Sequence, residues 1–280
     1  MTLPNFIILG AAKAGTTALY HYLRQHPQIY LSPLKETNFF ALEGETPCFC
    51  GPGDDDYVNR LSITTLEGYQ TQFAGLRGET AIGEASPLYL YSPKAVQRIR
   101  RYVPDARLIA FVRNPVDRAF SAFLHLVRDN REPCCEFRDG LAAEEERIRA
   151  GWEHIWHYKR MGLYHEQLRR YYDAFPPEQI RVFLYKDLRR EPRRTLEEIF
   201  RFLQVDPGFV PDMRERYNAT TGLPPEKRPA LLPEVCAELR AYFREDSLRL
   251  QDLIRRDLSH WLDGEPAPAE AVTEDDPGAA

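Results

Sequence analysis

Short apolar segments recur along the chain at intervals that suit a layered fold. The runs FIILG (6–10) and RLIAFVR (107–113) are almost continuously apolar, which is typical of strands buried on both faces of a sheet. Further segments with strand character lie at 29–31, 80–86 and 179–188. The pattern therefore predicts strands at these five places.

Between these segments the apolar residues follow helical spacing. In 195–203, for example, Leu196, Ile199 and Leu203 fall on one helical face. Helices are expected at 16–25, 66–74, 93–103, 115–127, 138–149, 163–174, 195–203 and 234–258, and mostly loop at 42–65 and 204–233. Strands that alternate with helices predict a three-layer α/β domain, in which helices flank a central parallel sheet.

Composition narrows the class of protein. The 280 residues are 43% apolar and 28% charged, with a net charge of -5, so no basic surface suggests a nucleic-acid partner. No apolar run is long enough for a membrane span and no signal peptide is evident, which favours a cytoplasmic protein. The five cysteines lack zinc-site spacing and are expected to be free thiols. We expect one domain over 1–263, followed by a disordered acidic tail at 264–280.

The segment GAAKAGTT (10–17) follows the first strand and combines small residues with Lys13 and two threonines. Glycines in such a turn let backbone N–H groups face an anion, and the helix begun by Thr16 and Thr17 adds its positive end. A triphosphate loop of the type G-x-x-x-x-G-K-[ST] has a lysine where Thr16 stands here. The loop is therefore P-loop-like but favours a shorter phosphate chain. A tight turn with an exposed lysine is the purely structural alternative.

A second polar turn follows the strand at 107–113. In LIAFVRNPVDRAFSAFLH (108–125), Arg113 leaves the strand and Asn114-Pro115 begins a helix. A guanidinium at this place can bind a phosphate through two hydrogen bonds, and the Ser121 hydroxyl follows on the helix. Because ligands of parallel sheets bind at the carboxyl ends of the strands, a ligand is expected at these two turns.

Together these segments resemble the sulfotransferases that use 3′-phosphoadenylyl sulfate (PAPS). GAAKAGTT is similar to the family's 5′-phosphosulfate loop, and RNPVDRAFS (113–121) to its 3′-phosphate segment R-[DN]-P-x-x-R-x-x-S. PAPS would then be the co-substrate and adenosine 3′,5′-bisphosphate (PAP) the product, with no metal required. The resemblance implies that the cofactor-binding residues are Lys13, Ala14, Gly15, Thr16, Thr17, Arg113 and Ser121.

A later segment also resembles the family. YNATTGLPPEKRPALLP (217–233) is similar to a loop that closes over the nucleotide, which implies that Lys227 and Arg228 contact it. The family usually has a glycine between its basic residues, and this sequence does not. As an isolated pair, the two residues would suit a solvated charged surface equally well.

The segment SPLKETNFF (32–40) resembles one in the glycosaminoglycan sulfotransferases, where the glutamate is the general base. The resemblance assigns that role to Glu36, with Lys13 as the second catalytic residue. We expect burial beside Phe39 and Phe40 to raise the pKa of Glu36 toward the operating pH. A glutamate at a helix N-terminus, followed by two core phenylalanines, is the structural alternative.

Two residues compete with Glu36 for the role of base. His125 lies one helical turn after Ser121, and the small-molecule sulfotransferases use a histidine base. Glu84 lies in GEASPLYL (83–90), which resembles the family segment E-K-[ST]-P-x-Y-[FL]. Here Ala85 replaces the family lysine, which argues against a heparan-like polyanionic acceptor and against a base that depends on that lysine.

The expected reaction is in-line transfer of the sulfuryl group to an acceptor hydroxyl or amine. The acceptor class stays open among small molecules, glycans and lipids, as does the oligomeric state. The alternatives are a P-loop-type kinase of a small metabolite and a non-catalytic nucleotide-binding module. Several aromatic or histidine side chains are candidates for the acceptor cleft or for helix packing: Trp152, Trp156, His157, Tyr158 and Tyr164.

Overall fold

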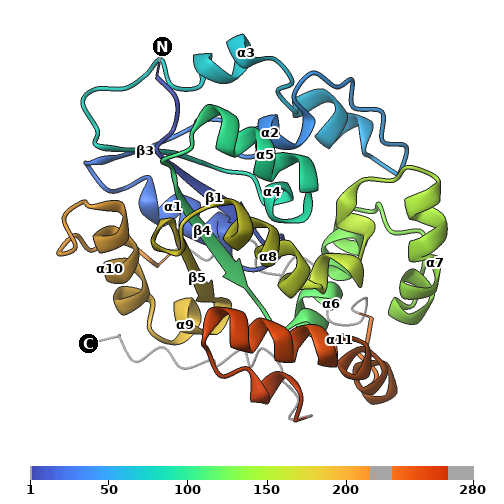
Figure 1. The fold of residues 1–280 in the computed structure, drawn as a ribbon. Helices are drawn as coiled ribbons and strands as arrows, with labels where there is room; N and C mark the ends of the chain where they lie inside the picture. Colours follow the sequence, from blue (N-terminus) through green and yellow to red (C-terminus); the bar gives the residue numbers. More distant parts are fainter. Residues whose placement is uncertain (1, 215–228, 264–280) are drawn as a thin grey trace, which may run out of the picture.

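A sheet of five parallel strands forms the centre of the computed structural model, which describes residues 2–214 and 229–263 (Figure 1). The order across the sheet is β2-β3-β1-β4-β5. The strands are β1 (Phe6–Gly10), β2 (Ile29–Leu31), β3 (Ala81–Ala85), β4 (Arg107–Val112) and β5 (Ile180–Leu184). All neighbouring pairs are parallel, so the expected α/β fold with a parallel sheet is confirmed.

Helices connect successive strands in the described residues. The α-helices are α1 (Thr16–Leu23), α2 (Phe39–Leu42), α3 (Leu66–Thr71), α4 (Leu88–Tyr91), α5 (Pro93–Tyr102), α6 (Pro115–Arg128), α7 (Phe137–Arg149), α8 (Tyr164–Ala174), α9 (Tyr185–Arg190), α10 (Pro192–Leu203) and α11 (Pro233–Ile254). Short helices of other types are η1 (Asp55–Asn59), η2 (His154–Trp156), η3 (Arg160–Gly162), η4 (Pro177–Gln179) and η7 (Ser259–Trp261).

The helices lie on both sides of the sheet, as Figure 1 shows. Helices α4, α5 and α8 pack against one another in front of the strands, and α1 lies behind them. Helix α11 packs along α8 and also contacts α6. The helical layers explain why β1 is buried along its whole length and β4 everywhere except its first residue.

The order of the strands indicates where along the sheet a ligand is expected to bind. Strand β1 lies between β3 and β4, so the chain leaves β1 toward one side of the sheet and later crosses to the other side. In open α/β sheets a crevice forms at such a reversal, at the carboxyl ends of the strands. The two polar turns, after β1 and after β4, therefore start from neighbouring strands at the same edge.

The structure corrects three expected element boundaries. The strand expected over 179–188 ends at Leu184, and α9 follows at once, because the apolar run ends there and the polar segment YKDLRR favours a helix. The segment 234–258, expected to be mostly helix, is helical as far as Ile254. The segment 42–65, expected as loop, contains the five-residue η1, a helix of the π type.

Candidate active site

The loop after β1 has a backbone that depends on glycine. Gly10 and Gly15 have positive φ values of 139° and 91°, a region that side chains with a Cβ rarely adopt. A Cβ on Gly15 would also lie 2.8 Å from the Tyr185 ring. Gly15 stands directly before α1, so the backbone N–H groups of the first helical turn, which begins at Thr16, lie next to the loop. This arrangement is suited to hold an anion.

Lys13 lies in the same loop and has unusual electrostatic surroundings. Burial, and next the positive charge of Arg128, lower the pKa of its ammonium group to about 8. Glu36 acts in the opposite direction, and Arg113 adds to the lowering. Burial and neighbouring cations make the protonated form of a lysine unfavourable, and a bound anion would stabilise that form.

The turn after β4 contacts the first loop directly. The Arg113 guanidinium donates a hydrogen bond of 3.3 Å to the Lys13 carbonyl oxygen and lies 4.8 Å from the centre of the Tyr185 ring. Asn114 caps α6, because its side-chain oxygen accepts a hydrogen bond from the Val116 N–H at 3.0 Å. The cap fixes the direction in which α6 carries Ser121 over the same space.

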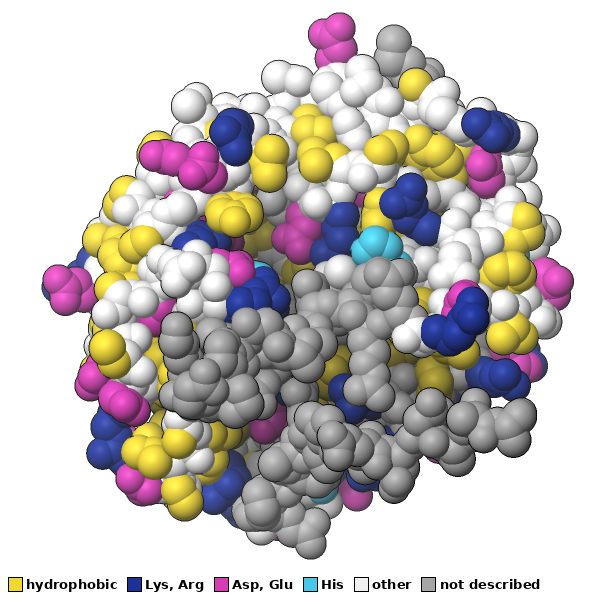
Figure 2. All heavy atoms as spheres, turned by 180° about the vertical axis from the view of Figure 1, so that it is seen from behind, with side chains coloured by type: hydrophobic (Ala, Val, Ile, Leu, Met, Phe, Trp, Pro, Cys, Tyr) yellow, Lys and Arg dark blue, Asp and Glu magenta, His cyan; other side chains and the backbone are white. Residues whose placement is uncertain are grey.

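These residues line one cleft with a volume of about 560 Å³. Figure 2 shows basic, acidic and histidine side chains close together near the centre of one face of the molecule. Ala14 belongs to the loop but is fully buried beneath it. The cleft brings together eight of the residues expected in the site: Lys13, Gly15, Thr16, Thr17, Glu36, Arg113, Ser121 and His125.

Glu36 lies in the cleft in a different environment from the one expected. Its side chain is 42% exposed, and its Oε1 accepts a hydrogen bond of 2.8 Å from the Lys35 ammonium group. Phe39 and Phe40 do not bury it, because both rings pack against Tyr69 in the core. The prediction that Glu36 is buried was therefore wrong. Its carboxylate is instead paired with the ammonium group of Lys35.

His125 also lines the cleft, with its ring already engaged. Its Nδ1 lies 2.7 Å from Nη2 of Arg128, which donates the hydrogen bond, and 3.6 Å from the Asp129 carboxylate. Burial lowers the pKa of His125 to about 3, with Lys13 as the next cause. The imidazole is therefore neutral at ordinary pH, with its proton on Nε2.

Glu84 is fully buried and does not line the cleft. Its carboxylate accepts hydrogen bonds of 2.7–2.8 Å from the hydroxyl groups of four residues, namely Thr37, Tyr69, Ser86 and Tyr89. Burial raises the pKa of Glu84, and these hydrogen bonds oppose the rise. With its oxygen atoms occupied in this way, Glu84 is part of the framework beneath Glu36.

The remaining residues that were expected in the site either lie outside the described residues or do not line the cleft. Lys227 and Arg228 lie outside the described residues. None of the five aromatic or histidine side chains considered at 152–164 lines the cleft. Trp156, Tyr158 and Tyr164 are buried in the core, so helix packing is the outcome there. Their neighbours His154 and Ile155 line the cleft instead.

Several lining residues did not emerge from the sequence: Lys35, Arg128, Asp129, Arg131, Glu153, His154 and Tyr185. A signal existed for Arg128 and Asp129, because they follow His125 by three and four residues on α6 and so share its face. Lys35 is adjacent to Glu36. Tyr185 lay in a segment expected to be a strand, and nothing local linked Arg131 or Glu153 to the loops.

No helix within residues 2–214 and 229–263 is long and apolar enough to cross a bilayer. The same residues contain no group of three or more histidine, cysteine, aspartate or glutamate side chains placed to hold a metal ion.

The chain resembles known proteins in sequence and in structure. A model of the sulfotransferase domain matches residues 3–221. The crystal structure of a sulfotransferase from Alicyclobacillus acidocaldarius is 44% identical, with a TM-score of 0.84, over 93% of this chain and 99% of that one.

Curated relatives are more distant. The membrane-associated sulfotransferase kil1 of Dictyostelium discoideum is 23% identical over 92% of this chain. The bifunctional heparan sulfate N-deacetylase/N-sulfotransferase 3 of Mus musculus is 26% identical over 93% of this chain. The chain spans 66% of the length of the first and 31% of the second. The domain match and the bacterial structure show that the chain belongs to the sulfotransferase domain family, the transferases that use PAPS.

Proposed function

We propose that this chain transfers the sulfuryl group of PAPS to a hydroxyl or amine, with Glu36 as the general base. One observation carries the proposal: a single cleft joins the glycine loop and Lys13 to Arg113, Ser121 and a carboxylate. Neither Lys13 nor Arg113 forms an ion pair with any carboxylate of the described residues. Two cations without an ion-pair partner among the described residues suit a co-substrate that carries anionic groups at two places.

The residues present fit this nucleotide. The backbone N–H groups at the start of α1 and the Thr16 and Thr17 hydroxyls line the cleft and would bind the phosphosulfate end. Arg113 and Ser121 would hold the 3′-phosphate, as the family resemblance implies. The hydrogen bond from Arg113 to the Lys13 carbonyl keeps the two anion-binding groups at a fixed separation.

The reaction follows from these positions. The Glu36 carboxylate takes the proton of the acceptor hydroxyl, whose oxygen forms a bond to sulfur. The bond between sulfur and the 5′-phosphate oxygen breaks, and its electron pair stays with the phosphate. Lys13 and the loop N–H groups stabilise the charge that grows on this leaving group. The products are a sulfate ester, or a sulfamate from an amine, and PAP.

Glu36 suits the role of base better than its two competitors. The Nδ1 of His125 already accepts a hydrogen bond from Arg128, and its low pKa makes the ring a weak base. Glu84 has no access to the cleft. Lys35 holds the Glu36 carboxylate in one orientation, and thus supplies an ammonium group beside the base where Ala85 removes the lysine of related enzymes.

A thermal-shift comparison tests the proposed co-substrate. PAP at about one hundred times its Kd is expected to stabilise the protein by about 2.7 kcal/mol, which raises Tm by several degrees. ATP with magnesium is expected to give a smaller shift, because the loop lacks the lysine that binds a β,γ-phosphate. Stabilisation by ATP with magnesium and none by PAP would favour a kinase and contradict the proposal. Transfer of labelled sulfate from PAPS to an added acceptor then separates an enzyme from a binding module.

A further inference from the structure

Part of the cleft lining is apolar. Six of its lining side chains form this surface, here called the apolar wall: Tyr57, Val58, Leu61, Pro87, Leu88 and Ile155. Tyr57 and Leu61 are 51% and 47% exposed, so apolar surface remains open to solvent beside the base. Exposed apolar surface next to a polar cleft is typical of a binding site.

The other cations that line the cleft, Lys35, Arg128 and Arg131, differ from Lys13 and Arg113 because each has a carboxylate partner. Lys35 binds Glu36 at 2.8 Å, and Arg131 binds the buried Asp54 at 2.6 Å. Arg131 also donates a hydrogen bond of 2.6 Å to the Pro52 carbonyl. Among the described residues of the cleft, an anionic acceptor would therefore find no unpaired cation other than Lys13 and Arg113, which the co-substrate occupies in the proposed function.

Arg131 is also held in place. Its partner Asp54 accepts hydrogen bonds from the backbone N–H groups of Gly51 and Glu153, at 2.8 Å and 2.9 Å. The Arg131 guanidinium lies 4.9 Å from the centre of the Tyr57 ring. If Arg131 turned toward a substrate, it would leave a buried carboxylate without its counter-charge, which is strongly unfavourable.

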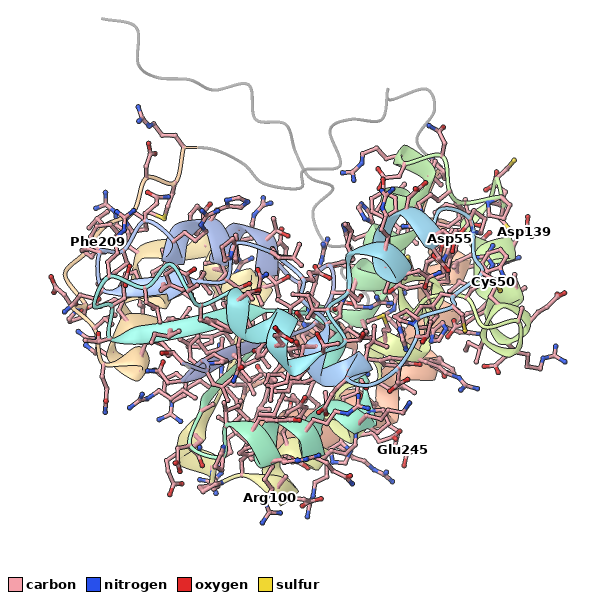
Figure 3. All side chains as sticks on the ribbon, turned by 90° about the horizontal axis from the view of Figure 1, so that it is seen from above. Cys50, Asp55, Arg100, Asp139, Phe209 and Glu245 are labelled. Atoms are coloured by element: carbon pink, nitrogen blue, oxygen red, sulfur yellow. The ribbon has the colours of Figure 1, made fainter. Side chains whose placement is uncertain are left out.

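This junction fixes the position of the apolar wall. Asp54 and Arg131 join the segment that carries Tyr57 to the end of α6, and the Cys50 N–H donates a hydrogen bond of 3.3 Å to the Gly151 carbonyl. Figure 3 shows Cys50 and Asp55 on the same side of the molecule as Asp139 of α7, with Phe209 at the opposite end. The Tyr57 part of the wall is thus held against the residues that follow α6.

Two titratable residues next to Ile155 in the cleft lining, Glu153 and His154, carry little charge. Burial, followed by the negative charge of Asp54, raises the pKa of Glu153 to about 8, so its carboxyl group is protonated at lower pH. Burial and then His157 lower the pKa of His154 to about 3, so its ring is neutral. Its buried Nδ1 has no hydrogen-bond partner in the described residues. Neutral donors and acceptors of this kind suit a hydroxyl group rather than an ion.

We propose that the acceptor is an uncharged alcohol with an apolar body, which lies on the apolar wall and presents its hydroxyl to Glu36. This inference rests on the proposed function, because it takes the sulfuryl donor and the base from there. The transfer forms a bond from the alcohol oxygen to sulfur and breaks the bond from sulfur to the 5′-phosphate. The alcohol proton goes to Glu36. A polyanionic sugar acceptor, of the kind named for the mouse relative, does not match this surface.

A matched pair of probes tests the acceptor class. An α,ω-alkanediol and the ω-hydroxyalkanoate of equal chain length differ only in one charged end. The diol is expected to have a kcat/KM at least about tenfold higher, because the carboxylate finds no free cation on the wall. The labelled sulfate is followed from PAPS, and binding of each probe to the PAP complex is measured by calorimetry.

A substitution in the apolar wall provides a second test of the acceptor class. Leu61→Lys is expected to raise the relative kcat/KM of the hydroxyalkanoate by about tenfold, since it adds an unpaired cation. Leu248→Lys, at a leucine of α11 that is 40% exposed and lies outside the cleft, is the matched control and should change nothing. Neither variant is expected to change the Kd for PAP.

The outcomes separate this inference from the proposed function. Failure to bind PAP would contradict the proposed function itself. Normal PAP binding together with a preference for the hydroxyalkanoate, or for a desulfated heparan chain, would overturn the uncharged acceptor alone. Absence of calorimetric binding of the diol to the PAP complex would overturn it as well.

Discussion

Among single residues, Lys13 has an unusual protonation equilibrium. Its pKa of about 8 is far below the usual value for lysine, mainly because the side chain is buried, so the free protein loses this charge just above neutral pH. A bound anion restores the proton. Nucleotide binding and protonation of Lys13 are therefore expected to be linked.

This linkage predicts a pH dependence of PAP affinity. Below pH 8 Lys13 is charged and the Kd should be nearly constant, whereas above pH 8 the Kd should rise by up to about tenfold per pH unit. Calorimetry across this range measures the slope. Lys13→Arg should bind PAP with little pH dependence, because arginine stays protonated throughout. An equal slope in both proteins would assign the titration to another group.

The choice of base gives a second prediction for single residues. Glu36→Gln keeps the shape of the side chain but cannot take a proton, so kcat is expected to fall by about 10²–10⁴ while the Kd for PAP stays unchanged. His125→Asn is expected to keep most of the activity, because Arg128 already occupies the Nδ1 of that ring. Single-turnover transfer of labelled sulfate measures both variants, and a larger loss in His125→Asn would reverse the assignment.

At the scale of elements, Glu84 joins four parts of the fold. Its own strand is β3, and the hydroxyl groups that it accepts from lie on α3, on α4, on the turn after β3 and on the segment before α2. Ser86 also accepts a hydrogen bond of 3.1 Å from the Asn38 N–H. Glu84 thus holds the turn from which Glu36 reaches the cleft.

Removing this carboxylate should be costly. Glu84→Ala leaves four buried hydroxyl groups without their acceptor, so the free energy of unfolding is expected to fall by about 3 kcal/mol or more. Urea denaturation measures the loss. Glu146→Ala, at an exposed glutamate of α7, is the control and should stay within about 0.5 kcal/mol of the parent. A similar small change in both variants would mean that Glu84 is not a structural junction.

The same elements explain what the sequence could predict. Strands β1 and β4 are marked by apolar runs, and the cleft residues at their ends follow from the rule for ligands in parallel sheets. Helices α2 and α4, of four residues each, leave too short a pattern to recognise. The surroundings of Glu36 and Tyr185 depend on contacts between segments far apart in the chain, which no local period records.

At the scale of the whole molecule, the end of the described fold is packed into the core. Leu258 and Trp261 follow α11 and are almost fully buried, with the Trp261 ring 6.3 Å from that of Tyr164. The domain limit at residue 263, expected from composition, stays a prediction. The packing of Trp261 indicates where a shortened chain should fail.

Two truncations test this limit. A chain that ends at Asp263 is expected to keep its Tm and its affinity for PAP. A chain that ends at Arg256 loses both Leu258 and Trp261 from the core and should be less stable by about 3–5 kcal/mol, the usual cost of deleting a buried large aromatic side chain. Calorimetric melting measures the stability of both chains. A large loss of stability in the longer chain would place the domain boundary further along the sequence.

The unpaired cations of the cleft also bear on the rate of turnover. PAP keeps both of its phosphate groups after the sulfuryl group has gone, so in the proposed function Lys13 and Arg113 would hold the product as firmly as the co-substrate. We therefore expect release of PAP, rather than bond breaking, to be the slow step of each cycle. An enzyme with this charge arrangement depends on its surroundings to clear spent nucleotide, and its output follows the rate of that removal.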